Sequence, residues 1–230
     1  MRVAAFALAC LLAAPAFAVP TQVEAEYRIS TNGITIGSVS ESYVRTGDTY
    51  RIESTTRAEG VLKLFRDDTV VLLSEGRVGP GGLQPLRFEQ RRAGDRSRDI
   101  LAEFDWKRSL LRSEYRGEEK TLALPPGTQD RLSIMYQFMN APPGGGRVRM
   151  HMSNGRKVDL YSYRKVDEPR LSTPAGEFDT THYERVTESE QESHAQLWLA
   201  RDRFNLPVRV VFEDANGLRL DQTLVSVTTR

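Results

Sequence analysis

The chain has almost no cysteine. Its 230 residues include a single one, Cys10. The rest of the sequence can therefore form no disulfide, supply no thiolate nucleophile and build no cysteine-based metal site. A domain without these supports is held together by the burial of apolar side chains, which predicts a continuous hydrophobic core.

Histidine is also scarce, with three residues, His151, His182 and His194. No pair has the spacing of a zinc site on a helix or on a strand. Met150 and Met152 share one face of a strand, where packing in the core is a more common role for methionine than Cu(I) binding. The sequence therefore predicts no metal and no cofactor.

Signatures of catalysis are missing as well. The chain contains no Gly-x-Ser-x-Gly nucleophile turn, no phosphate-binding loop and no Gly-x-Gly-x-x-Gly. His182 and Glu184 share a strand face, and a polar cross-strand pair is the ordinary interpretation of such residues. We expect a non-enzymatic protein. The less favoured alternative is a hydrolase of envelope polymers that uses His182, Glu184 or Asp130 as acid–base groups.

Charge of one sign is not in excess. The 32 basic residues fall to 31 without Arg2 and then match the 31 acidic residues. A balanced chain has no overall field that attracts nucleic acid, so we expect no nucleic-acid partner. One stretch is rich in arginine but interleaved with Asp95 and Asp99, and this mixture is typical of a solvated hairpin end. Its arginines are Arg87, Arg91, Arg92, Arg96 and Arg98.

Long apolar runs are absent too. Val3 to Leu12 is too short to span a bilayer. It follows the basic Arg2 and precedes Ala16-Phe17-Ala18, which has the small residues that a signal peptidase reads. The pattern predicts a leader over residues 1–18, cleaved after Ala18. The mature chain, residues 19–230, would then be a periplasmic protein with no membrane span.

What the sequence has in abundance is alternation with a period of two. Val23, Ala25, Tyr27 and Ile29 alternate with polar residues, as in a strand with one buried face. Asn-Gly pairs at 32–33, 154–155 and 216–217 favour tight hairpin turns. The predicted fold is mainly β, with about 10–12 antiparallel strands in a strongly curved sheet that forms a barrel or half-barrel.

One segment has helical spacing instead. Pro125-Pro126-Gly127 ends a strand, and Thr128 can cap a helix over residues 129–140. This helix is apolar over most of its surface, which requires burial on several sides. We therefore favour a single domain over residues 19–230, in which both halves cover the helix. Separate domains joined at residues 142–146 are the alternative.

The predicted helix suggests a ligand site in the concave face of the sheet. Asp130 suits the positive end of the helix, whereas Arg131 does not and needs a fixed acidic or carbonyl partner. Both residues are expected at a polar mouth. The same apolar side chains could instead fill the interior completely. The candidate lining is Met135, Tyr136, Phe138, Met139, Trp106 and Trp198.

Several motifs resemble those of a family of secreted bacterial proteins known only as a domain of unknown function. They include Gly-Thr-Gln-Asp-Arg-Leu-Ser at 127–133, Thr-Pro-Ala-Gly-Glu-Phe at 173–178 and Leu-Pro-Val-Arg at 206–209. A fainter resemblance is to periplasmic lipoprotein carriers of the LolA type. It implies an incomplete barrel over a hydrophobic cavity, and a lipid or lipoprotein acyl chain as partner. A scaffold that binds another envelope protein is the alternative function.

Overall fold

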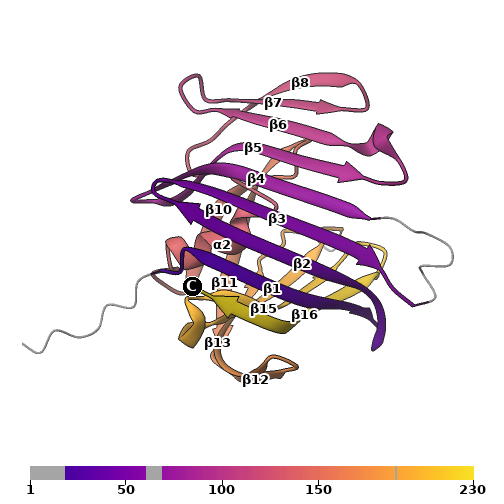
Figure 1. The fold of residues 1–230 in the computed structure, drawn as a ribbon, viewed down its shortest axis with the longest axis vertical. Helices are drawn as coiled ribbons and strands as arrows, with labels where there is room; N and C mark the ends of the chain where they lie inside the picture. Colours follow the sequence, from indigo (N-terminus) through magenta and orange to yellow (C-terminus); the bar gives the residue numbers. More distant parts are fainter. Residues whose placement is uncertain (1–18, 61–68, 190) are drawn as a thin grey trace, which may run out of the picture.

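The computed structural model describes residues 19–60, 69–189 and 191–230. The predicted leader lies outside these residues. Sixteen strands form one mostly antiparallel sheet (Figure 1). They are β1 (Gln22–Thr31), β2 (Ile34–Thr46), β3 (Thr49–Ala58), β4 (Val70–Gly79), β5 (Gly82–Arg92), β6 (Ile100–Asp105), β7 (Leu110–Tyr115), β8 (Glu118–Ala123), β9 (Gln129–Asp130), β10 (Arg147–Ser153), β11 (Val158–Asp167), β12 (Arg170–Thr173), β13 (Gly176–Arg185), β14 (His194–Ala200), β15 (Leu206–Glu213) and β16 (Arg219–Thr229).

The order across the sheet is β8-β7-β6-β5-β4-β3-β2-β1-β16-β15-β14-β13-β11-β10-β9, with β12 paired to β13. The first and last strands of the chain, β1 and β16, are therefore neighbours at its centre. The mainly β fold with a curved antiparallel sheet is confirmed, although the strands number sixteen, more than the 10–12 expected. The two-residue β9 and four-residue β12 are too short to show an alternating pattern.

The one α-helix among the described residues, α2 (Ser133–Asn140), lies against the concave side of the sheet (Figure 1). Tyr136 and Met139 share a core cluster with residues of β2 to β7. Phe138 packs with Tyr163 and Tyr183 of the other half. Both halves of the sheet thus cover the helix, as its apolar surface requires.

The helix begins four residues later than predicted, because Gln129 and Asp130 form β9, which pairs in parallel with β10. Thr128 does not cap the helix, since its hydroxyl donates to the carbonyl of Pro125 at 2.7 Å. The capping group is the Asp130 carboxylate, which accepts from the backbone N–H groups of Leu132 and Ser133 at 2.8 and 2.7 Å. The prediction placed the cap two residues too early.

Side-chain contacts bridge the two ends of the open sheet. The tip of the β10–β11 hairpin reaches the inner face of β5 to β7, where the Ser113 hydroxyl donates to the carbonyl of Gly155. Gly155 has a φ of +80°, and a Cβ there would lie 2.4 Å from Ile100 Cγ2. Gln129 Nε2 also donates to the carbonyl of Leu83 at 2.8 Å. These contacts hold the two ends of the half-barrel together. The contact at the β10–β11 tip requires glycine at position 155.

The strand ends define two ends of the half-barrel. At one end lie the β1–β2 turn, the end of β5, the β7–β8 turn and the β10–β11 tip, mostly on the right of Figure 1. Asn32 and Gly33 both have positive φ, as the Asn-Gly pattern predicted for a tight turn. The C-terminus and the first described residues lie at the opposite end, where the backbone N–H of Thr21 donates to the carbonyl of Arg230.

Candidate functional site: a basic mouth above a closed interior

The interior of the half-barrel is polar as well as apolar. Asp130 is completely buried, and its second carboxylate oxygen accepts from the Ser74 hydroxyl at 2.5 Å. Ser74 in turn lies 3.0 Å from the Tyr50 hydroxyl. Burial raises the pKa of Asp130, and the hydrogen bonds it accepts oppose that shift. Asp130 thus anchors the helix to β4 from within and does not lie at an opening.

A second buried carboxylate, Glu41 of β2, holds the middle of the helix. It accepts hydrogen bonds from Tyr136 at 3.1 Å and from Ser54 at 3.2 Å. Burial raises the pKa of Glu41 to about 7, although both hydrogen bonds lower it. Tyr136 also stacks on Tyr43, with ring centroids 5.2 Å apart. The helix therefore fits its sheet through specific hydrogen bonds as well as apolar contact.

The side chains proposed as a ligand lining are distributed over more than one region. Tyr136 and Met139 are buried in one cluster, with Met135 and Trp106 at its margin, and Phe138 belongs to the neighbouring cluster. Trp198 lies in a third cluster. Its strand register pairs it with His182, and it stacks on that ring at 4.3 Å. The structure brings four of them together and places Phe138 and Trp198 in two other clusters, so their role as one ligand lining stays a prediction.

The acid–base candidates do not converge. The His182 Nδ1 lies 3.0 Å from a carboxylate oxygen of Asp167, on the sheet face opposite Tyr183 and the helix. Glu184 instead forms an ion pair with Arg164 at 2.9 Å. Asp130 is enclosed beneath the helix. Among the described residues, no three histidine, cysteine or acidic side chains are grouped as a metal site would require.

Arg131 lies where the helix faces one end of the half-barrel. The residue as a whole is exposed, and its Nη1 lies 3.5 Å from the side-chain carbonyl of Gln90. Desolvation of the guanidinium and the nearby Arg92 lower the pKa of Arg131. The expected carbonyl partner is therefore an amide oxygen. Arg92 follows Gln90 by two residues on the same strand face, a separation of about 7 Å along β5. Two arginines thus flank one glutamine at the rim.

The β7–β8 turn and the β10–β11 tip add further cations to this rim. Tyr115 lies between two guanidinium groups, with Arg156 4.4 Å and Arg116 5.3 Å from its ring centroid. Lys157 follows Arg156, and Tyr161 stands further along the same hairpin beneath Arg185. We call this end of the half-barrel the basic mouth. It comprises Arg92, Arg116, Arg131, Arg156 and Lys157, with Tyr115 and Tyr161.

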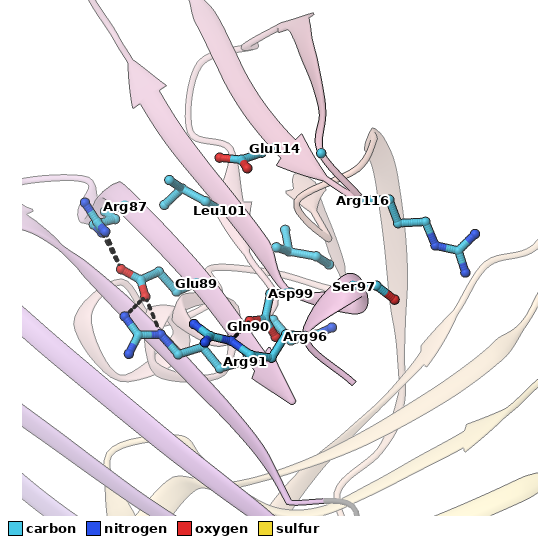
Figure 2. Close-up of a pocket in the computed structure, with 12 residues that line it drawn as sticks. Arg87, Glu89, Gln90, Arg91, Arg96, Ser97, Asp99, Leu101, Glu114 and Arg116 are labelled. Atoms are coloured by element: carbon cyan, nitrogen blue, oxygen red, sulfur yellow. Dashed lines mark hydrogen bonds and ion pairs between the residues drawn. The ribbon is translucent and has the colours of Figure 1, made fainter. Parts of the chain in front are cut away.

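Two pockets open at the mouth and share Arg116. One, of about 390 Å³, lies between β7–β8 and the hairpin tip. The other, of about 450 Å³, lies on β5 to β7 next to the short turn at Arg96–Arg98 (Figure 2). In the second pocket Glu89 binds both Arg87 and Arg91, so those arginines are already neutralised in part. The first pocket is lined by Ser113, Tyr115, Arg116, Glu118, Lys120, Asn154, Arg156 and Lys157.

Most cations of the basic mouth have no ion-pair partner among the described residues. Within the described part of the chain, Arg92, Arg116, Arg131 and Arg156 form no ion pair. The Nε of Arg92 is buried without a hydrogen-bond partner. Nearby carboxylates serve other groups: Asp99 accepts from the backbone N–H of Arg92, and Asp159 pairs with Lys157. Four guanidinium groups therefore offer donors to a ligand.

Sequence reasoning found only part of this site. It placed Arg131 at a polar mouth, and it noted Arg92 within an arginine-rich stretch that it treated as a solvated hairpin end. It missed Arg116, Arg156 and Tyr115. Arg116 and Arg156 each adjoin the glycine of a turn, at Gly117 and Gly155, and basic residues beside such turns were the available signal.

Residues 26–223 match a family described as a protein of unknown function, DUF3108. The chain belongs to this family. No curated protein matches it.

Solved structures share the fold of this DUF3108 chain. A crystal structure of a β-barrel-like protein of the domain of unknown function DUF1849 from Brucella abortus is similar over 93% of this chain and 100% of that one. The TM-score is 0.60 at 12% sequence identity. An exported protein with a YmcC-like fold from Bacteroides fragilis covers 91% of this chain and 96% of its own, at 13% identity and a TM-score of 0.34. At this identity, the DUF1849 likeness establishes the β-barrel-like fold.

Proposed function

We propose that this chain is a non-catalytic protein of the bacterial envelope that binds the anionic group of an amphiphilic molecule at its basic mouth. The observation that carries the proposal is the set of four arginines at the mouth that form no ion pair among the described residues. Arg116 and Arg156 line pockets there, and Arg92 and Arg131 flank Gln90. Guanidinium groups match phosphate and carboxylate oxygens in geometry and charge. A phosphate or carboxylate group is therefore the chemistry that this site fits.

Electrostatics favours an occupant at this position. Arg92 and Arg131 flank Gln90, and Arg116 and Arg156 flank Tyr115, so like charges are held near one another. Each pair raises the electrostatic free energy of the unliganded protein, and an anion between them lowers it. The proposal rests on this arrangement and not on net charge, which is close to zero.

The interior supports placing the charged group at the mouth. Glu41 and Asp130 already bind the helix through their oxygens, and Tyr136 and Met139 are almost completely buried. An acyl chain at these side chains would have to displace the helix and leave two buried carboxylates without donors, which is costly. The apolar part of an amphiphile therefore has more accessible contacts at the rim, such as Leu101 in the larger pocket.

The envelope location follows from the predicted leader over residues 1–18, which directs a chain out of the cytoplasm. Within the described ranges, no helix combines the length and the apolar character that crossing a bilayer requires. The non-catalytic role is supported by the separation of His182, Glu184 and Asp130, which share no cleft. These residues have structural partners instead, in Asp167, Arg164 and the start of the helix.

Calorimetric titration with dihexanoyl phosphatidylglycerol, kept below its micelle concentration, tests the proposal. We expect saturable binding that the zwitterionic dihexanoyl phosphatidylcholine does not reproduce. Replacing Arg131 and Arg156 by glutamine should weaken binding at least about tenfold, because charge-assisted hydrogen bonds are lost. Arg147→Gln is the matched control, since Arg147 is an exposed arginine at the far end of β10. Equal affinity for both lipids, or an unaffected double variant, would overturn the proposal.

A further inference from the structure

Exposed apolar side chains gather at the same end of the half-barrel as the basic mouth. Nine large hydrophobic side chains are exposed among the described residues. Six of them lie within three residues of a strand end at the mouth. The six are Ile34, Val71, Leu160, Val186, Phe212 and Leu218.

Two of these side chains stand at neighbouring hairpin tips. Ile34 follows the Asn32-Gly33 turn and is 65% exposed, and Leu218 ends the β15–β16 turn and is 50% exposed. The strands that carry these tips are paired, because Ser30 of β1 lies opposite Asp221 of β16. The two apolar tips therefore lie on neighbouring hairpins at the mouth end.

The turns that present these tips have defined hydrogen bonds and backbone angles. The Asp214 carboxylate accepts from the backbone N–H groups of Asn216 and Leu218, at 2.9 and 3.0 Å. The φ values of Asn32 and Gly33, 48° and 79°, match a two-residue hairpin turn. Ile34 and Leu218 are therefore held in water in the isolated protein. Moving them into an apolar phase would lower the free energy, because their apolar surface leaves water.

We propose that the mouth end docks on the surface of an anionic lipid bilayer, with the Ile34 and Leu218 tips inserted among the acyl chains and the arginines of the basic mouth at the head groups. The combination of exposed apolar side chains with unpaired cations on one face is what peripheral association with such a membrane requires. Charge complementarity favours a bilayer over an uncharged protein surface.

This inference deepens the proposed function, because an amphiphile held at the mouth would come from the bilayer beneath it. The C-terminus and the first described residues lie at the opposite end of the half-barrel, so docking at the mouth does not involve them. The arginines of the basic mouth would bind lipid head groups only weakly without the apolar tips. Apolar insertion adds affinity that does not depend on ionic strength, since it comes from apolar area removed from water.

Co-sedimentation with vesicles tests the docking surface. The protein is mixed with vesicles of phosphatidylglycerol and phosphatidylethanolamine, and with vesicles of phosphatidylcholine alone. We expect binding to the anionic vesicles and little to the others. The double variant Ile34→Asp with Leu218→Asp should lose at least tenfold in vesicle affinity. Val44→Asp with Val166→Asp is its matched control, because Val44 and Val166 are exposed but lie away from the mouth.

The outcomes separate this inference from the function on which it rests. If the tip variant still binds monomeric dihexanoyl phosphatidylglycerol but no longer sediments, both statements hold. If the unchanged protein binds the monomeric lipid and fails to sediment, or the tip variant sediments as well as its control, membrane docking is wrong and the proposed function stands. If sedimentation depends on the tips but the protein binds no monomeric lipid, membrane docking stands and the proposed function is wrong.

A second copy of the chain is the competing occupant of the tips. Sedimentation velocity over a range of protein concentrations distinguishes it. We expect a monomer at all concentrations. A dimer that the Ile34→Asp and Leu218→Asp changes abolish would assign the surface to self-association and overturn membrane docking.

Discussion

The interior around α2 and the basic mouth differ in how their ionisable side chains are paired. Inside, Glu41 and Asp130 each accept two or more hydrogen bonds from groups fixed in the fold. At the mouth, Arg92 and Arg156 have no carboxylate partner among the described residues. The buried carboxyl groups have hydrogen-bond partners within the protein, whereas these arginines can bind a ligand.

Interior residues therefore stabilise the fold, whereas residues of the mouth can bind a ligand. Truncating a satisfied buried group leaves its partners without donors or acceptors, so its removal destabilises the protein. Truncating an exposed arginine costs little stability, because solvent replaces its interactions. Variants in the two regions should therefore affect different measurements, and four predictions use that contrast.

The largest expected effect on stability is at the hairpin tip that joins the two regions. Gly155→Ala places a Cβ 2.4 Å from Ile100 Cγ2 at a φ of +80°. We expect the free energy of unfolding in urea to fall by about 3 kcal/mol, from overpacking and from the left-handed backbone together. Gly217→Ala has the same φ and no atom within 4 Å of the added Cβ. It should cost only about 1 kcal/mol. Equal losses would show that the tip does not dock.

The second prediction concerns the pH dependence of the interior. The pKa of Glu41 is about 7 in the folded protein, above its ordinary value of 4.5. Between these values the unfolded chain releases a proton that the folded chain retains, so stability falls as pH rises from 4.5 to 7. The loss should reach about 3 kcal/mol above pH 7.

Glu41→Gln should remove this contribution, so urea unfolding of the variant at pH 5 and pH 8 should differ less than that of the unchanged protein. Glu26→Gln, on the exposed face of β1, is the control. A Glu41→Gln variant with an unaltered pH profile would contradict the assignment of that carboxylate to the closed interior.

The third prediction uses salt to distinguish the regions. Raising sodium chloride from about 50 to about 500 mM should weaken binding of dihexanoyl phosphatidylglycerol about tenfold, since exposed charges at the mouth are screened. The free energy of unfolding should change far less, because the buried carboxylates are shielded from the ions. Calorimetry and urea titrations at both concentrations measure the two effects. Binding that resists salt would locate the ligand elsewhere.

The smallest effect is expected for an arginine that already has a partner. The exposed Arg91 forms an ion pair at 2.7 Å with the buried Glu89, which keeps Arg87 as a second partner. Arg91→Gln should change the free energy of unfolding by less than about 1 kcal/mol and leave lipid affinity unaltered. Arg131→Gln should weaken lipid binding with an equally small effect on stability. If the two variants weakened binding alike, the distinction between paired and unpaired arginines would fail.

The sequence predicted the curved antiparallel sheet because alternation and Asn-Gly turns are local signals, as at Asn32-Gly33. It also identified the buried helix from the spacing of Leu132 and Met139. It misplaced the start of that helix, because Thr128 and Asp130 are both good capping residues and the choice depends on pairing of β9 with β10. Such pairing is a tertiary contact that no local pattern contains.

The candidate site was less predictable than the fold. The turns that carry Arg116 and Arg156 adjoin strands at opposite ends of the sheet order, and contacts of Gly155 with Ile100 and Ser113 bring them together. The polar interior was missed for a similar reason. Glu41 shares the inward face of β2 with Val39 and Tyr43, but its hydrogen-bond partner Tyr136 lies on the helix, which no local pattern connects to this strand.

The most direct test is nuclear magnetic resonance mapping of dihexanoyl phosphatidylglycerol on the isotope-labelled protein, with backbone amide shifts followed through a titration. The account predicts saturable shifts at Arg116, Arg131 and Arg156, and unchanged signals at Tyr136 and Met139. Shifts centred on Tyr136 and Met139, with the arginine turns unaffected, would mean that the interior opens to the ligand and would contradict the division between a closed interior and a binding mouth.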